Sequence, residues 1–402
     1  MRMPRDYERI KRIQNALHEA DWDALVCARA SNVLLLTGYW PVIGTSIAVA
    51  TREGKIGLIV PEDERELVTE GNVDELEVFK AGSLEEIVTP AEKASPALAR
   101  LGRRFNIKRT SGFEHESRFE PTSYAGVHSY SGTLREILAA TIPVNFVPAD
   151  KILSRLRAAV TPIELARIRL ACCIADRAYA TGATQLCPGL TEIEAAARFR
   201  ALLSTLKVEH DEVERADGFA YCMSGPNAAN AFAAYQRSGS RQIKRGDLLL
   251  VHCNSWADGY WTDITRTYCC GEPPPKARQM LEAVLAARQA ALEMIRPGIK
   301  ASQVDLVTRD VIKEHGFEKE FKHPTGHGVG FAAINHLARP RLHPASDEVL
   351  APGMVFNVEP GVYVSGYGGV RHCDMVSVTE TAAEVLTPFH AELSDLILKA
   401  RS

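Results

Sequence analysis

Hydrophobic positions in the first part of the chain recur with the spacing of one amphipathic helix and several short strands. Residues 7–20 place Ile10, Ile13 and Leu17 on one side of a helix. Apolar runs that predict strands follow at residues 24–27, 46–50 and 56–60. Because these strands alternate with helical patterns, we expect an α/β amino-terminal domain.

The second part of the chain contains one local pattern twice. Residues 187–194 open a helical pattern that runs to Leu203, and residues 296–303 open another that runs to Ile312. Each copy has a Pro-Gly turn, a Thr or Ser that would cap the helix, and an apolar run with helical period. The repeat predicts two related halves.

A long helical pattern begins near residues 157–164, after Val147-Pro-Ala-Asp150. We therefore expect one domain over residues 1–150 and a second over residues 151–402. With 402 residues and 46% hydrophobic content, the chain is long enough to bury a large core.

Composition argues against several classes of function. A net charge of -3 gives no electrostatic reason to expect a nucleic-acid partner. No apolar run is long enough to span a bilayer, and no signal core follows the amino terminus, so no membrane partner is expected. The nine cysteines are an odd number and scattered, which predicts reduced thiols in the cytoplasm.

Candidate chemistry begins with a hairpin pattern over residues 246–267, where two β-rich runs flank Ala257-Asp258-Gly259. If Ala257 and Asp258 form the turn, His252 lies opposite Asp263. If Asp258 and Gly259 form it, His252 is the diagonal neighbour of Asp263 on the same face. Either register places an imidazole beside a carboxylate.

Two further segments carry potential metal ligands. Residues 323–330 place His327 on a glycine-rich turn, where the backbone can approach a ligand closely. Residues 354–376 read as strand, loop and strand, with Glu359 ending the first strand and Cys373 sharing a face with Arg371 on the next.

These residues resemble the pita-bread family that includes creatinase, prolidase, aminopeptidase P and methionine aminopeptidase. The resemblance extends over nearly the whole chain, including Ser31-Asn32 and Leu36-Thr-Gly38. The matching stretches are Gly259-Tyr260 with residues 262–267, His323 with residues 326–330, residues 352–354 with residues 359–361, and Gly369 with Arg371 and Asp374. The resemblance implies a creatinase-like amino-terminal α/β domain and a catalytic α+β pita-bread domain with a pseudo-twofold repeat.

In metal-dependent relatives Asp, Asp, His, Glu and Glu hold two divalent ions. Carried over by position, three ligands remain as Asp263, His327 and Glu359, whereas the other two positions hold His252 and Cys373. All five types can bind a metal, and a thiolate favours zinc over manganese. We expect a single zinc-like ion held by Asp263, His327, Glu359 and Cys373, with His252 as an auxiliary ligand. A site without metal, as in creatinase, is the alternative.

Other residues receive roles from the same resemblance. Glu359 would shuttle a proton, His323 would act as an acid or base or support a ligand, and His336 would polarise the substrate, although it lies farther from His327 than is usual. Phe232 stands where relatives have an active-site His. Cys373 could alternatively be a nucleophile or an inert buried thiol.

A second group of side chains could bind the substrate. Arg339 and Arg371, together with the neighbouring Arg341 and His343, could bind a carboxylate, or could form structural ion pairs and a solvated basic run. Phe232, Tyr235 and Trp261 could line a pocket or fill the core.

The sequence therefore predicts a homodimeric hydrolase that cleaves a C–N bond, amide or peptide, in a small polar substrate with a metal-activated water. Because Phe232 replaces an imidazole, ordinary Xaa-Pro cleavage is not expected. Three alternatives stay open: a metal-free hydrolase of a guanidino or cyclic amidine compound, a lyase on the same fold, and a non-catalytic binding protein.

Overall fold

The computed structural model describes residues 4–42, 44–68, 72–80, 85, 89–115, 131–233, 235–333 and 338–398. The chain divides into two units, Met1–Arg157 and Ala158–Ser402. The division that the sequence predicts, after residue 150, falls at the first residue of helix α6 (Asp150–Ala158) and stays a prediction.

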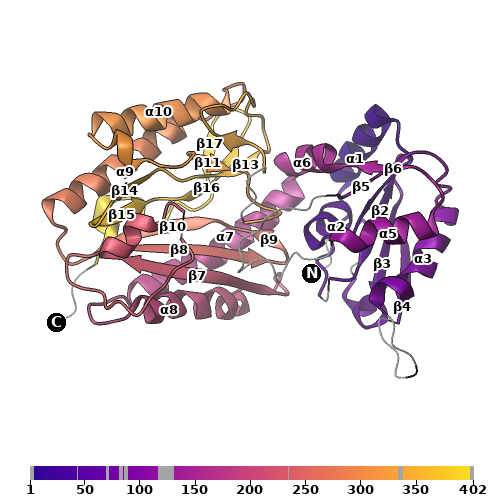
Figure 1. The fold of residues 1–402 in the computed structure, drawn as a ribbon, viewed down its shortest axis with the longest axis horizontal. Helices are drawn as coiled ribbons and strands as arrows, with labels where there is room; N and C mark the ends of the chain where they lie inside the picture. Colours follow the sequence, from indigo (N-terminus) through magenta and orange to yellow (C-terminus); the bar gives the residue numbers. More distant parts are fainter. Residues whose placement is uncertain are drawn as a thin grey trace. The chain divides into compact units, whose positions relative to one another are not determined.

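A six-stranded mixed sheet forms the middle of the first unit, in the order β4-β3-β2-β1-β5-β6 (Figure 1). β2 pairs antiparallel with β1 and β3, and the remaining neighbours are parallel. The α/β class predicted for this part is confirmed. The strands are β1 (Ala24–Cys27), β2 (Ile47–Thr51), β3 (Ile56–Pro61), β4 (Glu75–Phe79), β5 (Ser111–Phe113) and β6 (Phe146–Pro148).

Helices pack on this sheet through apolar faces. In α1 (Tyr7–Ala20) the predicted Ile10, Ile13 and Leu17 are buried, and the Asp6 side chain caps the helix by accepting a hydrogen bond from the Arg9 N–H. Among the described residues, the other helices of this unit are α2 (Ala30–Thr37), η1 (Glu62–Leu67), α3 (Pro90–Arg104), α5 (Ser131–Thr141) and α6.

The second unit begins with a helix pair and a meandering sheet. Its strands run in the order β18-β10-β8-β7, with β9 paired to β8. α8 lies along β7 on the outer side of this sheet (Figure 1). The elements are α7 (Pro162–Ala183), α8 (Glu192–Thr205), η2 (Leu206–Glu209), β7 (Ala216–Ser224), η3 (Gly225–Asn230), β8 (Leu248–Ala257), β9 (Tyr260–Trp261), β10 (Ile264–Cys270) and β18 (Ile397–Leu398).

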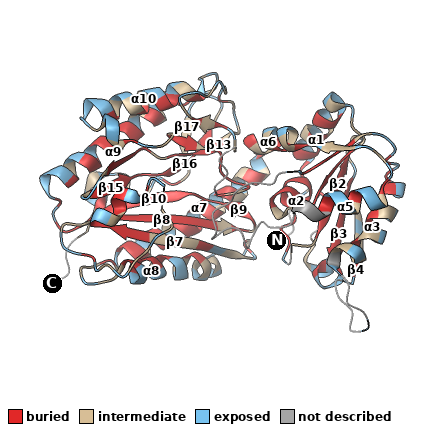
Figure 2. Ribbon diagram, viewed as in Figure 1, coloured by how far each residue is buried: buried red, intermediate tan, exposed pale blue. Residues whose placement is uncertain are grey.

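The second half repeats this plan with α9 (Pro275–Met294) and α10 (Ala301–Glu314) outside the sheet β13-β16-β17. The central strands of both halves are buried, whereas the helices expose their outer faces (Figure 2). The predicted pita-bread plan with its repeat is confirmed. The remaining elements are η4 (Glu318–Glu320), β11 (Gly326–His327), β12 (Arg341–Leu342), β13 (Val355–Val358), β14 (Gly361–Val364), β15 (Gly368–Arg371), β16 (Asp374–Val378), β17 (Ala383–Val385) and α11 (Leu393–Leu396).

The helix starts of the two halves differ from each other in one detail. Thr191 caps α8 as predicted, and its hydroxyl accepts a hydrogen bond from the Glu194 N–H. The prediction of a Ser cap on α10 was wrong, because Lys300 occupies the cap position and Ala301 is already helical. The Gln303 side chain accepts from the Lys300 N–H instead, so the orphan amide is satisfied without a hydroxyl.

Candidate active site

The hairpin β8–β9–β10 brings His252 next to Asp263. Ala257 pairs with Tyr260, so the turn consists of Asp258 and Gly259, both with positive φ (47° and 84°). This is the second of the two registers that the sequence allowed. His252 Nδ1 lies 3.7 Å from Asp263 Oδ1, and both side chains are buried.

His327 is held on the short strand β11 by close backbone approach at the glycines on either side. A Cβ on Gly326 would lie 2.0 Å from the carbonyl oxygen of Asn357, and a Cβ on Gly328 would lie 2.1 Å from that of Arg339. Only glycine fits at such distances. The His327 N–H donates to Asn357 Oδ1 at 2.7 Å, which fixes the backbone of β11 at the residue that carries the imidazole.

Glu359 and Cys373 come from the ends of strands. Glu359 follows β13, and its N–H donates to the carbonyl of Thr325. Cys373 lies in the break between β15 and β16, where its backbone exchanges hydrogen bonds with Thr265 of the hairpin. Cys373 and Arg371 therefore do not share a regular strand. An isolated bridge to Thr265 places the thiol beside Asp263.

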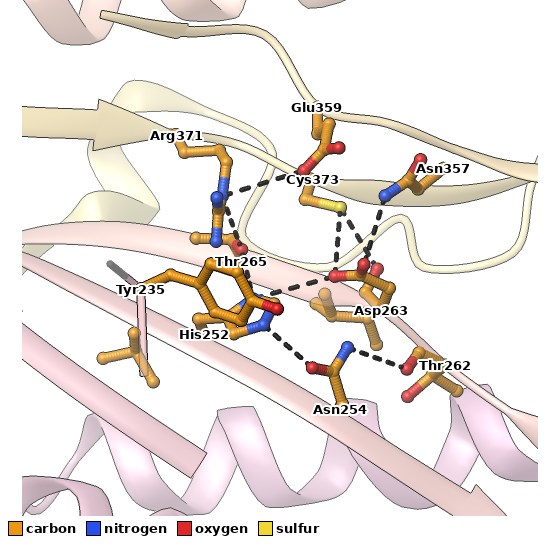
Figure 3. A network of polar contacts seen from close by, with 12 residues as sticks. Tyr235, His252, Asn254, Thr262, Asp263, Thr265, Asn357, Glu359, Arg371 and Cys373 are labelled. Atoms are coloured by element: carbon orange, nitrogen blue, oxygen red, sulfur yellow. Dashed lines mark hydrogen bonds and ion pairs between the residues drawn. The ribbon is translucent and has the colours of Figure 1, made fainter. Parts of the chain in front are cut away.

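Asp263, His327 and Glu359 approach one another in pairs. His327 Nε2 lies 3.5 Å from Asp263 Oδ2 and 3.8 Å from Glu359 Oε1. Ligands around one zinc ion at ordinary bond lengths are about 3.3 Å apart. Cys373 Sγ donates towards the Asp263 carbonyl at 3.1 Å and lies 3.8 Å from Oδ1 (Figure 3). The donor types suit one divalent ion.

These side chains do not yet form a complete set of metal ligands. Among the described residues, no three His, Cys, Asp or Glu side chains form a group that could hold an ion as they stand. The Asn357 side-chain amide nitrogen lies 3.3 Å from both Asp263 Oδ2 and His327 Nε2. An ion between these two ligands would have to displace the Asn357 amide. The donor types therefore suit an ion, but the Asn357 side chain would have to move before one could bind.

Burial and neighbouring charges set the ionisation of this cluster. Burial opposes the charge of His327, but the Asp263 hydrogen bond and nearby Glu359 raise its pKa to about 9. Burial and then the Asp263 charge raise the pKa of Glu359 to about 7. The pKa of Asp263 is lowered, because its contacts with His327 and His252 outweigh burial. Burial raises the pKa of the Cys373 thiol well above its usual value.

His252 differs from the other candidate ligands because both ring nitrogens have hydrogen-bond partners. Nδ1 lies 3.0 Å from Thr265 Oγ1, and Nε2 lies 2.9 Å from Asn254 Oδ1 (Figure 3). Tyr221 stacks on the ring and Tyr235 meets it edge-on, at centroid distances of 6.4 and 5.0 Å. Burial lowers the pKa of His252 to about 4, so the ring is neutral.

Arg371 faces the same cluster from the end of β15. Its Nε donates to Thr265 Oγ1 at 3.1 Å and lies 3.9 Å from Glu359 Oε2 (Figure 3). Its Nη2 is buried and has no hydrogen-bond partner among the described residues. A buried guanidinium with an unused donor can bind an anionic group of a ligand.

His323 and the aromatic residues form a second side of the site. His323 Nδ1 and Nε2 lie 2.8 Å from the Pro324 carbonyl and from the Tyr363 hydroxyl. Burial lowers the pKa of His323 to about 3. The Phe232 ring lies 5.8 Å from that of Tyr363, and Lys322 Nζ lies 4.8 Å above it. Phe232 is 36% exposed, so it lies at the surface of this wall.

The remaining candidates contact other groups, belong to the core or lie outside the described residues. His336 falls outside the described residues, and its role stays a prediction. Arg339 forms an ion pair with Glu348 with its side chain half exposed, and the Arg341 N–H donates to the same carboxylate. Trp261 is fully buried and part of the core.

Several polar residues of this site, Asn357 among them, were not predicted from the sequence. Thr265 and Asn254 lie on the same face of the hairpin as His252, which strand alternation would have indicated. Glu192 is another. Its buried carboxylate accepts hydrogen bonds from Ser224 N and Oγ, from the Asn227 side chain and from Gly239 N, so it holds both ends of the segment that carries Phe232 and Tyr235. No local signal marks it.

Similar proteins are found for the whole chain. The Xaa-Pro dipeptidase of Pyrococcus furiosus is 29% identical over 386 residues, which is 96% of this chain and 99% of that protein. The probable dipeptidase PepE of Mycobacterium tuberculosis is 37% identical over 61% of this chain and 63% of its own length. The solved structure of an Xaa-Pro dipeptidase from Bacillus anthracis superposes with a TM-score of 0.79 at 25% identity, covering 97% of this chain and 99% of the other.

Family models match both units. The creatinase/prolidase amino-terminal domain matches residues 9–159, and metallopeptidase family M24 matches residues 166–380. Within the described ranges, every helix is too short or too polar to traverse a bilayer. The model for family M24 covers more than half of the chain and includes Asp263, His327, Glu359 and Cys373. The chain is a hydrolase of the peptidase type and belongs to metallopeptidase family M24.

Proposed function

We propose that this hydrolase cleaves dipeptides that carry a free carboxylate, with one divalent ion, zinc, held by Asp263, His327 and Glu359. The observation that carries the proposal is the approach of His327 Nε2 to both carboxylates, at 3.5 and 3.8 Å. The similar proteins of Pyrococcus furiosus and Mycobacterium tuberculosis are named as dipeptidases, which supports a peptide substrate of this size.

Charge supports one ion rather than two. The positions that are carboxylates in two-metal relatives hold His252 and Cys373 here, and both side chains are neutral in their buried surroundings. Two negative charges are therefore missing, which equals the charge of one divalent ion. A buried second ion without that compensation would be strongly unfavourable.

When bound, the ion would polarise the scissile carbonyl and lower the pKa of a water molecule. Glu359 is buried within reach of His327 and Arg371 and would take the proton of that water and return it to the leaving amine. His323 has both ring nitrogens in contact with Pro324 and Tyr363, so we assign it to positioning the Tyr363 hydroxyl.

Arg371 supplies the recognition of the substrate. Its unused Nη2 would bind the carboxylate of a dipeptide, while Tyr235 and Phe232 exclude water on one side. Arg371→Lys removes the planar donor pair but keeps the charge. We expect KM for a free dipeptide to rise at least about tenfold, and that for the amidated dipeptide to change little. Equal loss on both substrates would argue against this assignment.

The metal is tested on protein purified without added ions. Elemental analysis should find close to one zinc equivalent per chain, which Asp263→Ala and His327→Ala abolish. Turnover by protein that carries no metal would exclude the proposal. It would favour a metal-free hydrolase of a guanidino or cyclic amidine compound, which the pairing of Arg371 with Glu359 also supports.

We also propose a homodimer in the cytoplasm. All nine cysteines are free in the structure, which suits a reducing compartment. The dimer rests on the resemblance to two-domain relatives alone. Sedimentation equilibrium at micromolar concentration would measure it, and a single monomeric species would contradict it.

A further inference from the structure

We infer that His252 is not a metal ligand but a fixed neutral imidazole that stands at a carboxylate position of two-metal relatives and so limits the site to a single ion. The inference rests on the proposed one-ion function. It is carried by a hydrogen-bond chain that links Arg371, Thr265, His252 and Asn254 to the Thr262 carbonyl.

The donor and acceptor types at the two ends limit the hydrogen bonds of this chain. A guanidinium nitrogen can only donate, so Thr265 Oγ1 accepts from Arg371 Nε at 3.1 Å. Thr265 Oγ1 lies 3.0 Å from His252 Nδ1 and can donate its hydroxyl hydrogen to that nitrogen. When Nδ1 carries no hydrogen, it accepts from this hydroxyl and its lone pair is occupied.

The other end of the chain leads to the same tautomer. Asn254 Nδ2 faces the Thr262 carbonyl at 3.4 Å, which turns its oxygen towards His252 Nε2 at 2.9 Å. An amide oxygen only accepts, so Nε2 must carry the hydrogen. The neutral ring is therefore protonated on Nε2, and its Nδ1 accepts from Thr265. Neither nitrogen offers a free lone pair to an ion.

The surroundings prevent His252 from leaving this arrangement. The residue is 2% exposed, and its ring lies between Tyr221 and Tyr235. If Nδ1 bound an ion, the Thr265 hydroxyl, which is completely buried, would lose its acceptor. Cys373 fills the second altered position, and its thiol points at the Asp263 carbonyl at 3.1 Å. Together these two neutral groups occupy the space of the missing carboxylates.

The first experiment measures the tautomer in the intact wild-type protein. Nitrogen-15 NMR of protein labelled at histidine should show His252 with Nε2 protonated and Nδ1 as a hydrogen-bond acceptor. Addition of zinc should move the His327 resonances to those of a bound nitrogen and leave the His252 tautomer unchanged. A His252 Nδ1 shift typical of a metal-bound nitrogen would overturn the inference.

Zinc stoichiometry by isothermal titration provides the second measurement. His252→Asn should keep one equivalent with less than about a threefold change in Kd, whereas the matched control His327→Asn should lose more affinity than the roughly 10- to 100-fold that mutation of a second-shell partner costs. The double variant His252→Asp with Cys373→Glu should take up a second equivalent. Two tight equivalents in the wild type, or a loss in His252→Asn equal to that in His327→Asn, would refute the assignment.

The two proposals fail in different ways. If the wild type binds no zinc at all, the one-ion function is wrong, but the NMR tautomer measured on the same sample still decides the role of His252. If zinc binds and His252 is a ligand, the function stands and this inference falls.

Discussion

The carboxylate of Asp374 joins two guanidinium groups in the interior of the second unit. Oδ1 accepts from Arg266 Nη2 at 2.6 Å, in a place where neither side chain contacts solvent, and Oδ2 accepts from Arg288 Nε. Arg266 also donates to the Cys373 carbonyl at 2.7 Å. The triad therefore fixes β10, α9 and the break that carries Cys373 relative to one another.

Asp374→Asn should destabilise the protein strongly, because it leaves buried positive charge without its partner. We expect the free energy of unfolding to fall by about 3–5 kcal/mol. Denaturant titration followed by circular dichroism measures it. Glu384→Gln is the matched control, since Glu384 pairs with Arg169 at the surface and should cost less than about 1 kcal/mol. Similar losses for both variants would show that the buried triad adds no stability.

Gly328→Ala should displace His327. The new methyl group would lie 2.1 Å from the Arg339 carbonyl oxygen, so β11 must move away from β12. We expect activity to fall at least about a hundredfold, as misplacement of a catalytic group by about 1 Å does. Gly316→Ala is the control, because its φ of 82° makes alanine strained by about 1–2 kcal/mol but nothing lies within 4 Å. It should lose stability and keep activity.

Glu192→Gln should loosen the segment that carries Phe232 and Tyr235. An amide cannot accept from all of the donors of Ser224, Asn227 and Gly239, and one unsatisfied buried donor costs about 1–3 kcal/mol. We expect KM to rise while kcat changes less, because the segment forms the wall of the site. Glu194→Gln changes an exposed carboxylate of the same helix and should leave KM unaltered. An unaltered KM in Glu192→Gln would mean that the segment is held by other contacts.

Phe232→His should improve cleavage of Xaa-Pro dipeptides, because it restores an imidazole that relatives place at this position. We expect kcat/KM to rise about tenfold or more, a modest part of what acid–base catalysis can supply. Phe232→Tyr controls for aromatic size without an imidazole. Efficient Xaa-Pro hydrolysis by the wild type, with no gain in the variant, would show that Phe232 has been misinterpreted.

Much of the local structure follows from the sequence. The helix at residues 7–20, the strand at residues 24–27 and the turn residues Asp258 and Gly259 depend on periodicity and on backbone preferences that act over a few residues. The presence of Asp263, His327 and Glu359 in three separate segments could be recognised in the same way. The prediction of a Ser cap on α10 was wrong because the Gln303 side chain accepts from the Lys300 N–H instead. Both ways of capping the helix depend on nearby residues only, and sequence patterns do not rank them.

What the sequence determined by itself is the set of side chains: which residues can bind a metal, and that two carboxylate positions are occupied by His252 and Cys373. What only the tertiary structure decided is how those side chains are used. His252 is hydrogen-bonded to Thr265 and Asn254. The aromatic rings that contact it belong to Tyr221 of β7 and Tyr235 after η3, and Arg371 of β15 binds Thr265. A lone pair becomes available or occupied according to neighbours that are distant in sequence, because hydrogen-bond direction is set by the geometry of all partners together.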